Sequence, residues 1–261
     1  MKMFPKLLEK LRERDGQVGY TCDACGKEIF AFPKKRLCAE CIGELPLNDK
    51  FSCDKCGRKS VTAGVCLDCK RSLPHFTQGV SPFVYGGKVA SLVNAMKKGK
   101  RRLAEFFGEE AAEAFFEKFQ DELKAEGAED WLLIPVPLTD SVKKKRGYNQ
   151  AAETCKSVEK RLKELGVSAA MDETVLEKRL ETSSQKHLTF VERQENLKGA
   201  FHVHKRSVCK GKNILLVDDV MTTGATGSET AALLLGAGAK RVIFLTGASL
   251  PERKHVAATA E

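Results

Sequence analysis

The sequence predicts an α/β protein in which a mostly parallel sheet is flanked by helices and preceded by a cysteine-rich module. Two short apolar runs, residues 131–134 and 214–217, are typical of strands buried on both faces of a parallel sheet. Around them, apolar residues recur at helical spacing, the alternation expected of an α/β domain. Eight of the ten cysteines fall within the first 75 residues. We therefore expect a metal module at residues 1–75 and an α/β domain at residues 76–261.

The composition indicates a folded protein outside the membrane. A chain of 261 residues with 42% hydrophobic residues has room for an α/β domain, a small module and a core. No stretch approaches 18 consecutive apolar residues, and the first 14 residues are charged throughout, without a signal-peptide core. We expect a cytoplasmic protein without membrane insertion. In a reducing compartment, this many cysteines indicates metal binding rather than disulfides.

The cysteines form four C-x-x-C pairs, separated by twelve, eleven and nine residues. Each pair presents two sulfurs, and two pairs complete a closed tetrahedral site that leaves no position for substrate. We predict two structural Zn²⁺ ions in a double zinc ribbon. Sequential pairing closes shorter loops than a cross-brace does, so we favour it while keeping the cross-brace as the alternative. The predicted ligands are Cys22, Cys25, Cys38, Cys41, Cys53, Cys56, Cys66 and Cys69.

The formal net charge of +9 is modest evidence for nucleic-acid binding. Eight thiolates holding two Zn²⁺ ions would lower the net charge by four. Clustering of the basic residues is more informative, and it occurs at residues 34–36, 97–102 and 143–146. Each cluster is either a solvated surface or a contact for an anionic ligand or a nucleic-acid backbone.

The elements of the α/β domain can be placed in chain order. Strands are expected at residues 80–85, 131–134, 174–178, 200–204, 214–217 and 241–246. Helices are expected at residues 3–12, 89–96, 103–123, 150–165 and 227–235. Asn149 suits the N-cap of the helix that follows it. Residues 180–194 are polar and lack a clean period, which predicts a mobile lid or an ordinary surface loop.

The strongest candidate site follows the strand at residues 214–217. Asp218 and Asp219 stand where that strand leaves the core, and residues 221–226 are mostly hydroxylic, small or glycine. Free N–H groups at the start of the next helix form a cradle for an anion at the carboxyl edge of the sheet. A carboxylate pair beside a phosphate cradle suits a ribose 5-phosphate, with Mg²⁺ nearby.

This stretch resembles the phosphoribosyl pyrophosphate (PRPP) motif of type I phosphoribosyltransferases, in which an apolar strand, two acids and a Thr-Thr-Gly-x-Thr loop follow one another. The resemblance implies a catalytic role for Asp218 and Asp219. It implies PRPP binding by Val217, Thr222, Thr223, Gly224, Ala225 and Thr226. In that class the loop after the preceding strand holds pyrophosphate, which here corresponds to Pro135, Val136 and Pro137, with further neutralisation from Arg146.

Residues 146–151, Arg-Gly-Tyr-Asn-Gln-Ala behind Pro-Val-Pro-Leu, narrow the resemblance to the ComF competence-protein family. A spaced pattern agrees, formed by Arg179, Thr182, Gln185, Leu188, Arg193, Asn196, Ala200 and Phe201. With the cysteine module included, the resemblance covers almost the whole chain. It implies transfer of a phosphoribosyl group with release of pyrophosphate. It also implies a role in natural transformation, with single-stranded DNA and other competence proteins as partners.

The alternative from another class is a protein that senses PRPP without catalysis or binds single-stranded DNA as an adaptor. Aromatic residues that could stack on bases are Tyr148, Phe30 and Phe76, although core packing is the commoner role of such residues. So short a tail after residue 246 makes the cysteine module the best candidate for a hood over the acceptor side of the site. The sequence does not indicate which molecule would accept the phosphoribosyl group.

Overall fold

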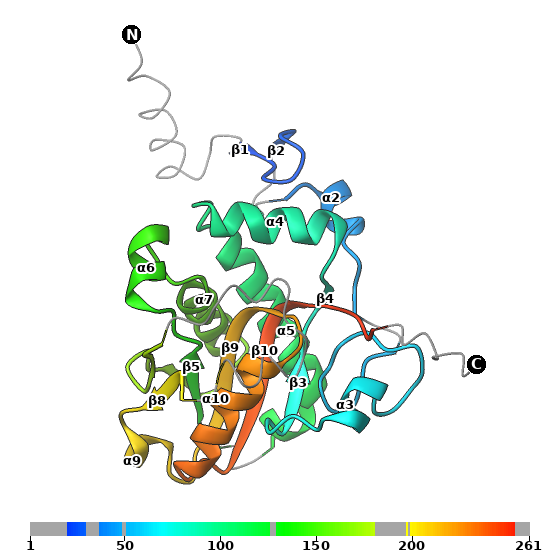
Figure 1. Ribbon diagram of the computed structural model, residues 1–261. Helices are drawn as coiled ribbons and strands as arrows, with labels where there is room; N and C mark the ends of the chain where they lie inside the picture. Colours follow the sequence, from blue (N-terminus) through cyan, green and yellow to red (C-terminus); the bar gives the residue numbers. More distant parts are fainter. Residues whose placement is uncertain are drawn as a thin grey trace, which may run out of the picture.

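The computed structural model describes residues 20–29, 37–48, 51–125, 129–180, 197 and 199–253, which contain both strands and helices (Figure 1). The strands are β1 (Tyr20–Thr21), β2 (Glu28–Ile29), β3 (Gln78–Val80), β4 (Phe83–Val84), β5 (Trp131–Pro135), β6 (Ala169–Met171), β7 (Leu176–Lys178), β8 (Phe201–Val203), β9 (Asn213–Met221) and β10 (Arg241–Ser249). The helices are α2 (Ala39–Gly43), α3 (Leu67–Arg71), α4 (Gly87–Lys97), α5 (Leu103–Leu123), α6 (Asp140–Arg146), α7 (Gln150–Glu164), α9 (Arg206–Cys209) and α10 (Ala225–Gly236).

A parallel sheet forms the centre of the molecule. Its strands run in the order β3-β10-β9-β5-β6, and β4 pairs with the end of β10. Because every pairing is parallel, the carboxyl ends of all these strands meet at one edge. This confirms the predicted fold class, and the helices expected at residues 103–123 and 150–165 are α5 and α7.

Several predicted boundaries were wrong. The strand expected at residues 80–85 is two short strands, β3 and β4, interrupted at Pro82, which has no N–H for the ladder. Strand β9 continues through the acid pair to Met221, because its pairing with β10 continues to Ser249. Helix α10 begins at Ala225, two residues earlier than predicted, and residues 140–146 form a helix that was not predicted.

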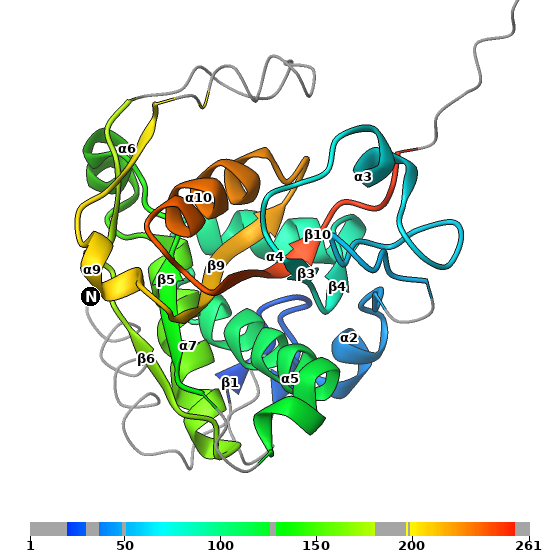
Figure 2. The ribbon, with the colours of Figure 1, turned by 90° about the horizontal axis from the view of Figure 1, so that it is seen from below.

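Helices cover both faces of the sheet. Figure 2 shows α5 and α7 on one face and α10 on the other. The side chains of α5 that face the sheet recur at a spacing of four, at Phe107, Ala111 and Phe115, and all three are buried. At Gly108 the two helices cross closely, since a Cβ there would lie 2.6 Å from the carbonyl oxygen of Thr154 on α7. Glycine at this position therefore lets α5 and α7 pack together.

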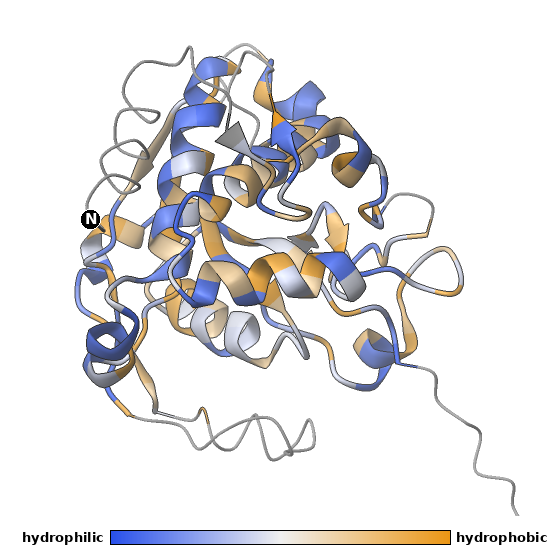
Figure 3. Ribbon diagram, turned by 90° about the horizontal axis from the view of Figure 1, so that it is seen from above, coloured by the Kyte–Doolittle hydropathy of each residue, from blue (hydrophilic) through white to orange (hydrophobic). Residues whose placement is uncertain are grey.

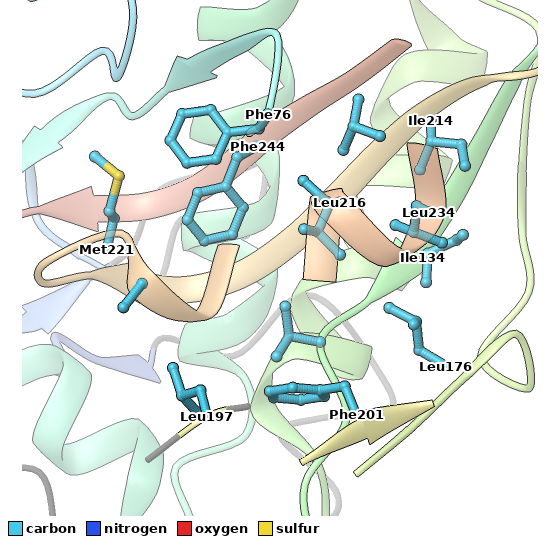
Figure 4. Close-up of a cluster of buried hydrophobic side chains, with 14 of the residues drawn as sticks. Phe76, Ile134, Leu176, Leu197, Phe201, Ile214, Leu216, Met221, Leu234 and Phe244 are labelled. Atoms are coloured by element: carbon cyan, nitrogen blue, oxygen red, sulfur yellow. The ribbon is translucent and has the colours of Figure 1, made fainter. Parts of the chain in front are cut away.

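The core between α10 and the sheet contains aromatic and aliphatic side chains from most of the domain (Figure 4). The rings of Phe76 and Phe244 lie 5.3 Å apart between their centroids. The same cluster of buried residues includes the third and fourth cysteine pairs, Cys53, Cys56, Cys66 and Cys69. The second half of the cysteine module is thus part of the main core.

The two halves of the cysteine module contact different parts of the α/β domain (Figure 1). The first half, with the antiparallel strands β1 and β2 and helix α2, lies beside α4. The carboxylate of Asp23 in this half pairs with Lys100 at 3.3 Å and with Arg102 at 3.5 Å. The second half, with α3, lies beside β3, where a Cβ on Gly57 would be only 2.2 Å from the carbonyl oxygen of Gly79.

The remaining predictions concern elements outside the central sheet. Strands β7 and β8 form a separate antiparallel pair, slightly shorter than the strands expected at residues 174–178 and 200–204. The helix expected at residues 3–12 lies outside the described residues. So does the expected lid after residue 180.

Candidate functional site

The acid pair lies at the carboxyl end of β9, where five buried residues give way to partly exposed ones. Oδ1 of Asp218 accepts a hydrogen bond from the backbone N–H of Asp219 at 2.8 Å. Burial, and then the neighbouring Asp219 carboxylate, raise the pKa of Asp218 to about 8. The two carboxyl groups are therefore not easily ionised at the same time. Such a pair can bind a cation or accept hydrogen bonds from hydroxyl groups.

Residues 222–226, here called the threonine loop, lead from the end of β9 into the first turn of α10. Gly224 has a φ of +83°, a conformation that favours glycine, and α10 begins at the next residue. The side-chain oxygen of Thr223 accepts a hydrogen bond from the N–H of Ala225 at 3.3 Å. N–H groups of a first helical turn lack acceptors within the helix, so the loop and the start of α10 form an anion cradle.

The loop after β5 lies next to the acid pair. The backbone N–H of Val136 donates to the carbonyl oxygen of Val217 at 2.8 Å, and Pro135 is the register partner of Val217. The side chain of Asn149 donates to the carbonyl oxygen of Val136 at 3.0 Å and also caps α7 by accepting from Ala151. Parallel pairing of β5 with β9 therefore brings together the two loops that the sequence assigned to pyrophosphate and ribose phosphate.

Sequence reasoning did not single out Lys97, the last residue of α4. Its ammonium lies 2.9 Å from Oδ2 of Asp219. Burial lowers the pKa of Lys97, but the charges of Asp219 and Asp218 outweigh burial and raise that pKa overall. Lys97 belonged to the predicted basic cluster at residues 97–102, and only the tertiary structure separates it from the rest.

Three other members of that cluster, Lys100, Arg101 and Arg102, make structural contacts. Lys100 and Arg102 pair with Asp23 of the cysteine module. The guanidinium of Arg101 lies 4.6 Å from the centroid of the Tyr148 ring and donates to the carbonyl oxygen of Gly147 at 2.9 Å. The cluster therefore serves mainly to assemble the fold, and Lys97 is its contribution to the acid pair.

Arg146 lies at the end of α6 with its side chain exposed. Its Nη1 donates to Oε1 of Gln150 at 3.2 Å, and its charge opposes protonation of Lys97. The amide nitrogen of Gln150 is buried and has no hydrogen-bond partner within the described part of the chain. Lys97 thus contacts the acid pair, and Arg146 lies close enough to Lys97 for their charges to interact, an arrangement suited to a ligand that also carries phosphate.

The aromatic candidates for base stacking have different environments. Phe76 is fully buried against Phe244, and Tyr148 is buried with its hydroxyl donating to the carbonyl oxygen of Met96. Phe30 lies outside the described residues. Phe76 and Tyr148 are therefore packing residues, which is the commoner role of buried aromatic side chains.

The eight paired cysteines form two groups, Cys22 with Cys25, Cys38 and Cys41, and Cys53 with Cys56, Cys66 and Cys69. Within each group all Sγ atoms lie within 4.8 Å of one another. Backbone N–H groups donate to sulfur in both, from Cys38 to Cys22 and from Cys66 to Cys53, each at 3.3 Å. Four converging thiols with such donors fit a Cys₄ zinc site, and the grouping follows the sequential arrangement rather than the cross-brace.

The fold and the loops at its carboxyl edge define a class of protein. The chain belongs to the phosphoribosyl transferase domain family, whose model matches residues 113–256, just over half of the chain. The predicted type I phosphoribosyltransferase domain is thereby confirmed, and the two Cys₄ groups are consistent with the predicted N-terminal zinc-ribbon module.

Named relatives of the chain indicate a narrower group within this class of protein. The chain is 24% identical over 227 residues to competence protein ComFC of Bacillus subtilis, covering 84% of this chain and 86% of that protein. It is 27% identical over 212 residues to DNA utilization protein YhgH of Escherichia coli K12, covering 79% and 87%. Competence protein F of Haemophilus influenzae is 25% identical, with 85% and 86% covered. The resemblance to the ComF competence-protein family is confirmed.

Matches to solved structures are more distant. The complex of B. subtilis glutamine PRPP amidotransferase with ADP and GMP shares 16% identity at a TM-score of 0.34, and the match covers 56% of this chain and about a quarter (26%) of that one. A hypoxanthine phosphoribosyltransferase from Trypanosoma cruzi shares 14% identity at a TM-score of 0.35, covering 58% and 75%. Among the helices described, none is long and apolar enough to cross a membrane.

Proposed function

We propose that this protein binds PRPP at the acid pair and the threonine loop and transfers its phosphoribosyl group with release of pyrophosphate. The observation that carries the proposal is the acid pair, Asp218 and Asp219, at the end of β9, followed directly by the turn at Gly224 that opens α10. In this proposal the ribose hydroxyls donate to the acid pair, and the 5-phosphate accepts from N–H groups of the threonine loop.

The acid pair and its cations suit the chemistry of that transfer. An acceptor atom forms a bond to C1 of the ribose while the bond from C1 to the pyrophosphate oxygen breaks, and the bonding electrons leave with pyrophosphate. The negative field of the acid pair, which is strongest once Asp218 has lost its proton, favours the positive charge that develops at C1. Lys97, Arg146 and the loop at residues 135–137 would hold the leaving group. Mg²⁺ bound with PRPP would neutralise part of the pyrophosphate charge, and carboxylate oxygens are ligands that it prefers.

Calorimetry with PRPP and Mg²⁺ tests the binding site. The unmodified protein should bind PRPP only with Mg²⁺, and the double variant Asp218→Asn/Asp219→Asn should lose binding, because each charge-assisted hydrogen bond is worth about 1.5–3 kcal/mol. The control is Glu129→Gln, whose carboxylate accepts from Asn213 at the opposite end of β9. Equal affinity in the double variant and the control would rule out the ribose assignment.

Catalysis and sensing are separated by measuring pyrophosphate release. With PRPP and a panel of bases and nucleic acids, release that depends on one acceptor supports a transferase. Binding without release under any condition supports the alternative, a protein that senses PRPP. The division into a zinc-ribbon module at residues 1–75 and a transferase domain at residues 76–261 is part of the same proposal.

Single-stranded DNA binding is a second proposal, favoured by a specific surface. Lys143, Lys144 and Lys145 are exposed on α6, which is coloured mainly as hydrophilic in Figure 3. Two of the relatives are named for competence and one for DNA utilization. Binding of DNA phosphates along α6 would release the counterions of the DNA. The logarithm of the affinity should therefore fall by about 0.7 per phosphate contact for each tenfold rise in salt concentration. A flat salt dependence would contradict it.

A further inference from the structure

Arg58 connects the second Cys₄ group to the threonine loop, across 165 residues of sequence. Its side chain is only 3% exposed. Nε donates to Sγ of Cys56 at 3.2 Å, Nη1 to Oδ2 of Asp68 at 3.1 Å and Nη2 to the carbonyl oxygen of Thr223 at 3.2 Å. One buried guanidinium thus contacts a metal-site sulfur, a carboxylate and the backbone of the loop.

The module behind Arg58 has a fixed position on the domain. The carboxylate of Glu252, just after β10, accepts from the hydroxyl of Ser60 at 2.8 Å and from the backbone N–H groups of Val61 and Leu67 at 3.1 and 2.6 Å. On the other side, the backbone N–H of Gly79 donates to the carbonyl oxygen of Lys55 at 2.8 Å. Arg58 therefore extends toward the loop from a part of the module that these hydrogen bonds fix to the domain.

The loop has less support from packing on this side. A cavity of about 180 Å³ separates the module from α10, and its walls include Arg58, Thr223, Gly224 and Ser228. A backbone segment beside open space is held chiefly by its hydrogen bonds. Gly224, which follows the carbonyl that Arg58 contacts, also has access to more backbone conformations than other residues.

We propose that Arg58 is a positioning residue for the threonine loop, through which zinc in the second Cys₄ site holds the loop in the conformation that binds phosphate. Cys56 and Asp68 orient the guanidinium, and the guanidinium holds the carbonyl of Thr223. The Cys56 sulfur would be fixed in place as a ligand of bound zinc. Loss of metal from this site releases the first contact and loosens the loop. The expected effect on phosphate binding rests on the proposed PRPP function, whereas the contacts of Arg58 with the loop do not.

The test compares Arg58→Met with a matched variant, Lys88→Met. Lys88 contacts the other Cys₄ group in a similar way, with Nζ 3.6 Å from Sγ of Cys41, and it also pairs with Glu44, which lies in the cysteine module rather than in the loop. Metal content, hydrogen exchange of backbone amides and PRPP affinity are measured on the full chain. Arg58→Met should keep two zinc ions and show about tenfold faster exchange at residues 223–228 alone, with about tenfold weaker PRPP binding. Lys88→Met should change neither.

A merely structural role for Arg58 would raise exchange across the whole domain. Unchanged exchange at residues 223–228 in Arg58→Met, or an equal rise throughout β9 and β10, overturns the proposal. If Arg58→Met loses zinc, Arg58→Lys serves instead, because lysine keeps the charge beside Cys56 but cannot reach all three partners. Equal loop exchange in Arg58→Lys and the unmodified protein would then overturn it. Exchange is measured without PRPP, so a failure of PRPP to bind refutes the proposed function and leaves this test intact.

Discussion

The ammonium of Lys97 lies 2.9 Å from a carboxylate oxygen of Asp219, so helix α4 partly neutralises the acid pair at the end of β9. The pairing brings a residue from the start of the α/β domain to the carboxyl end of its central strand. A ligand with both hydroxyls and phosphates can use the two charges together, because the hydroxyls donate to the carboxylates while the phosphates accept from the ammonium.

Lys97→Met tests this role. The variant should bind PRPP about tenfold more weakly, because it loses one charge-assisted contact to phosphate and leaves the carboxylates less compensated. Calorimetry measures the affinity, with Lys98→Met as the control, since Lys98 is the neighbouring lysine and is exposed. Equal or tighter binding by Lys97→Met would show that Lys97 serves only to balance the acid pair.

The raised pKa of Asp218 predicts how stability depends on pH. The folded-state pKa of about 8 lies above the ordinary value of 3.8, so between these values the folded protein keeps a proton that the unfolded chain releases. This group therefore makes the free energy of unfolding fall as pH rises from about 4 to about 8. Asp218→Asn removes that contribution.

The measurement is urea unfolding of the unmodified protein and Asp218→Asn across that pH range. The variant should be more stable at pH 8 by at least about 1 kcal/mol, the worth of roughly one pKa unit, and the two proteins should converge toward pH 4. A stability difference that stays constant with pH would contradict the assigned cause.

The two Cys₄ groups predict separate metal sites. Cys66→Ser/Cys69→Ser should hold one Zn²⁺ per chain, because its first group, at residues 22–41, remains complete. Cys25→Ser/Cys38→Ser is the reciprocal variant and should also hold one. Metal analysis by mass spectrometry decides the outcome. A variant without any zinc would favour shared ligands, as in the cross-brace.

The exposed lysines of α6 predict a separation of DNA binding from PRPP binding. Replacing Lys143, Lys144 and Lys145 by glutamine should lower the salt slope for single-stranded DNA by about 2, at about 0.7 per contact. PRPP affinity should not change, whereas Arg146→Gln should weaken it. Replacing the exposed Lys210 and Lys212 by glutamine is the control. Weaker PRPP binding without the three lysines would place α6 at the pyrophosphate instead.

Much of the fold was predictable because its signals are local. Buried strands, helical periodicity and C-x-x-C spacing depend on residues near one another in the chain, and they predicted α5, β5, α7 and both cysteine groups. Strand limits were less predictable, since β9 ends where its ladder with β10 ends and not where its apolar run stops. The interruption of residues 80–85, by contrast, has a local cause, because Pro82 has no N–H for the ladder.

The sequence by itself determined the family and the candidate sites, because the acid pair, the threonine loop and the cysteine pairs are each continuous or regularly spaced. Tertiary structure alone decided which distant charges meet them. Lys97 belongs to a basic cluster whose role the sequence left open, and no sequence pattern singles out Arg58. In the structure Lys97 reaches Asp219, and Arg58 reaches the carbonyl of Thr223. The physical reason is that a long cationic side chain finds its partner through the packing of strands and helices, and the chain order of those elements does not specify their contacts.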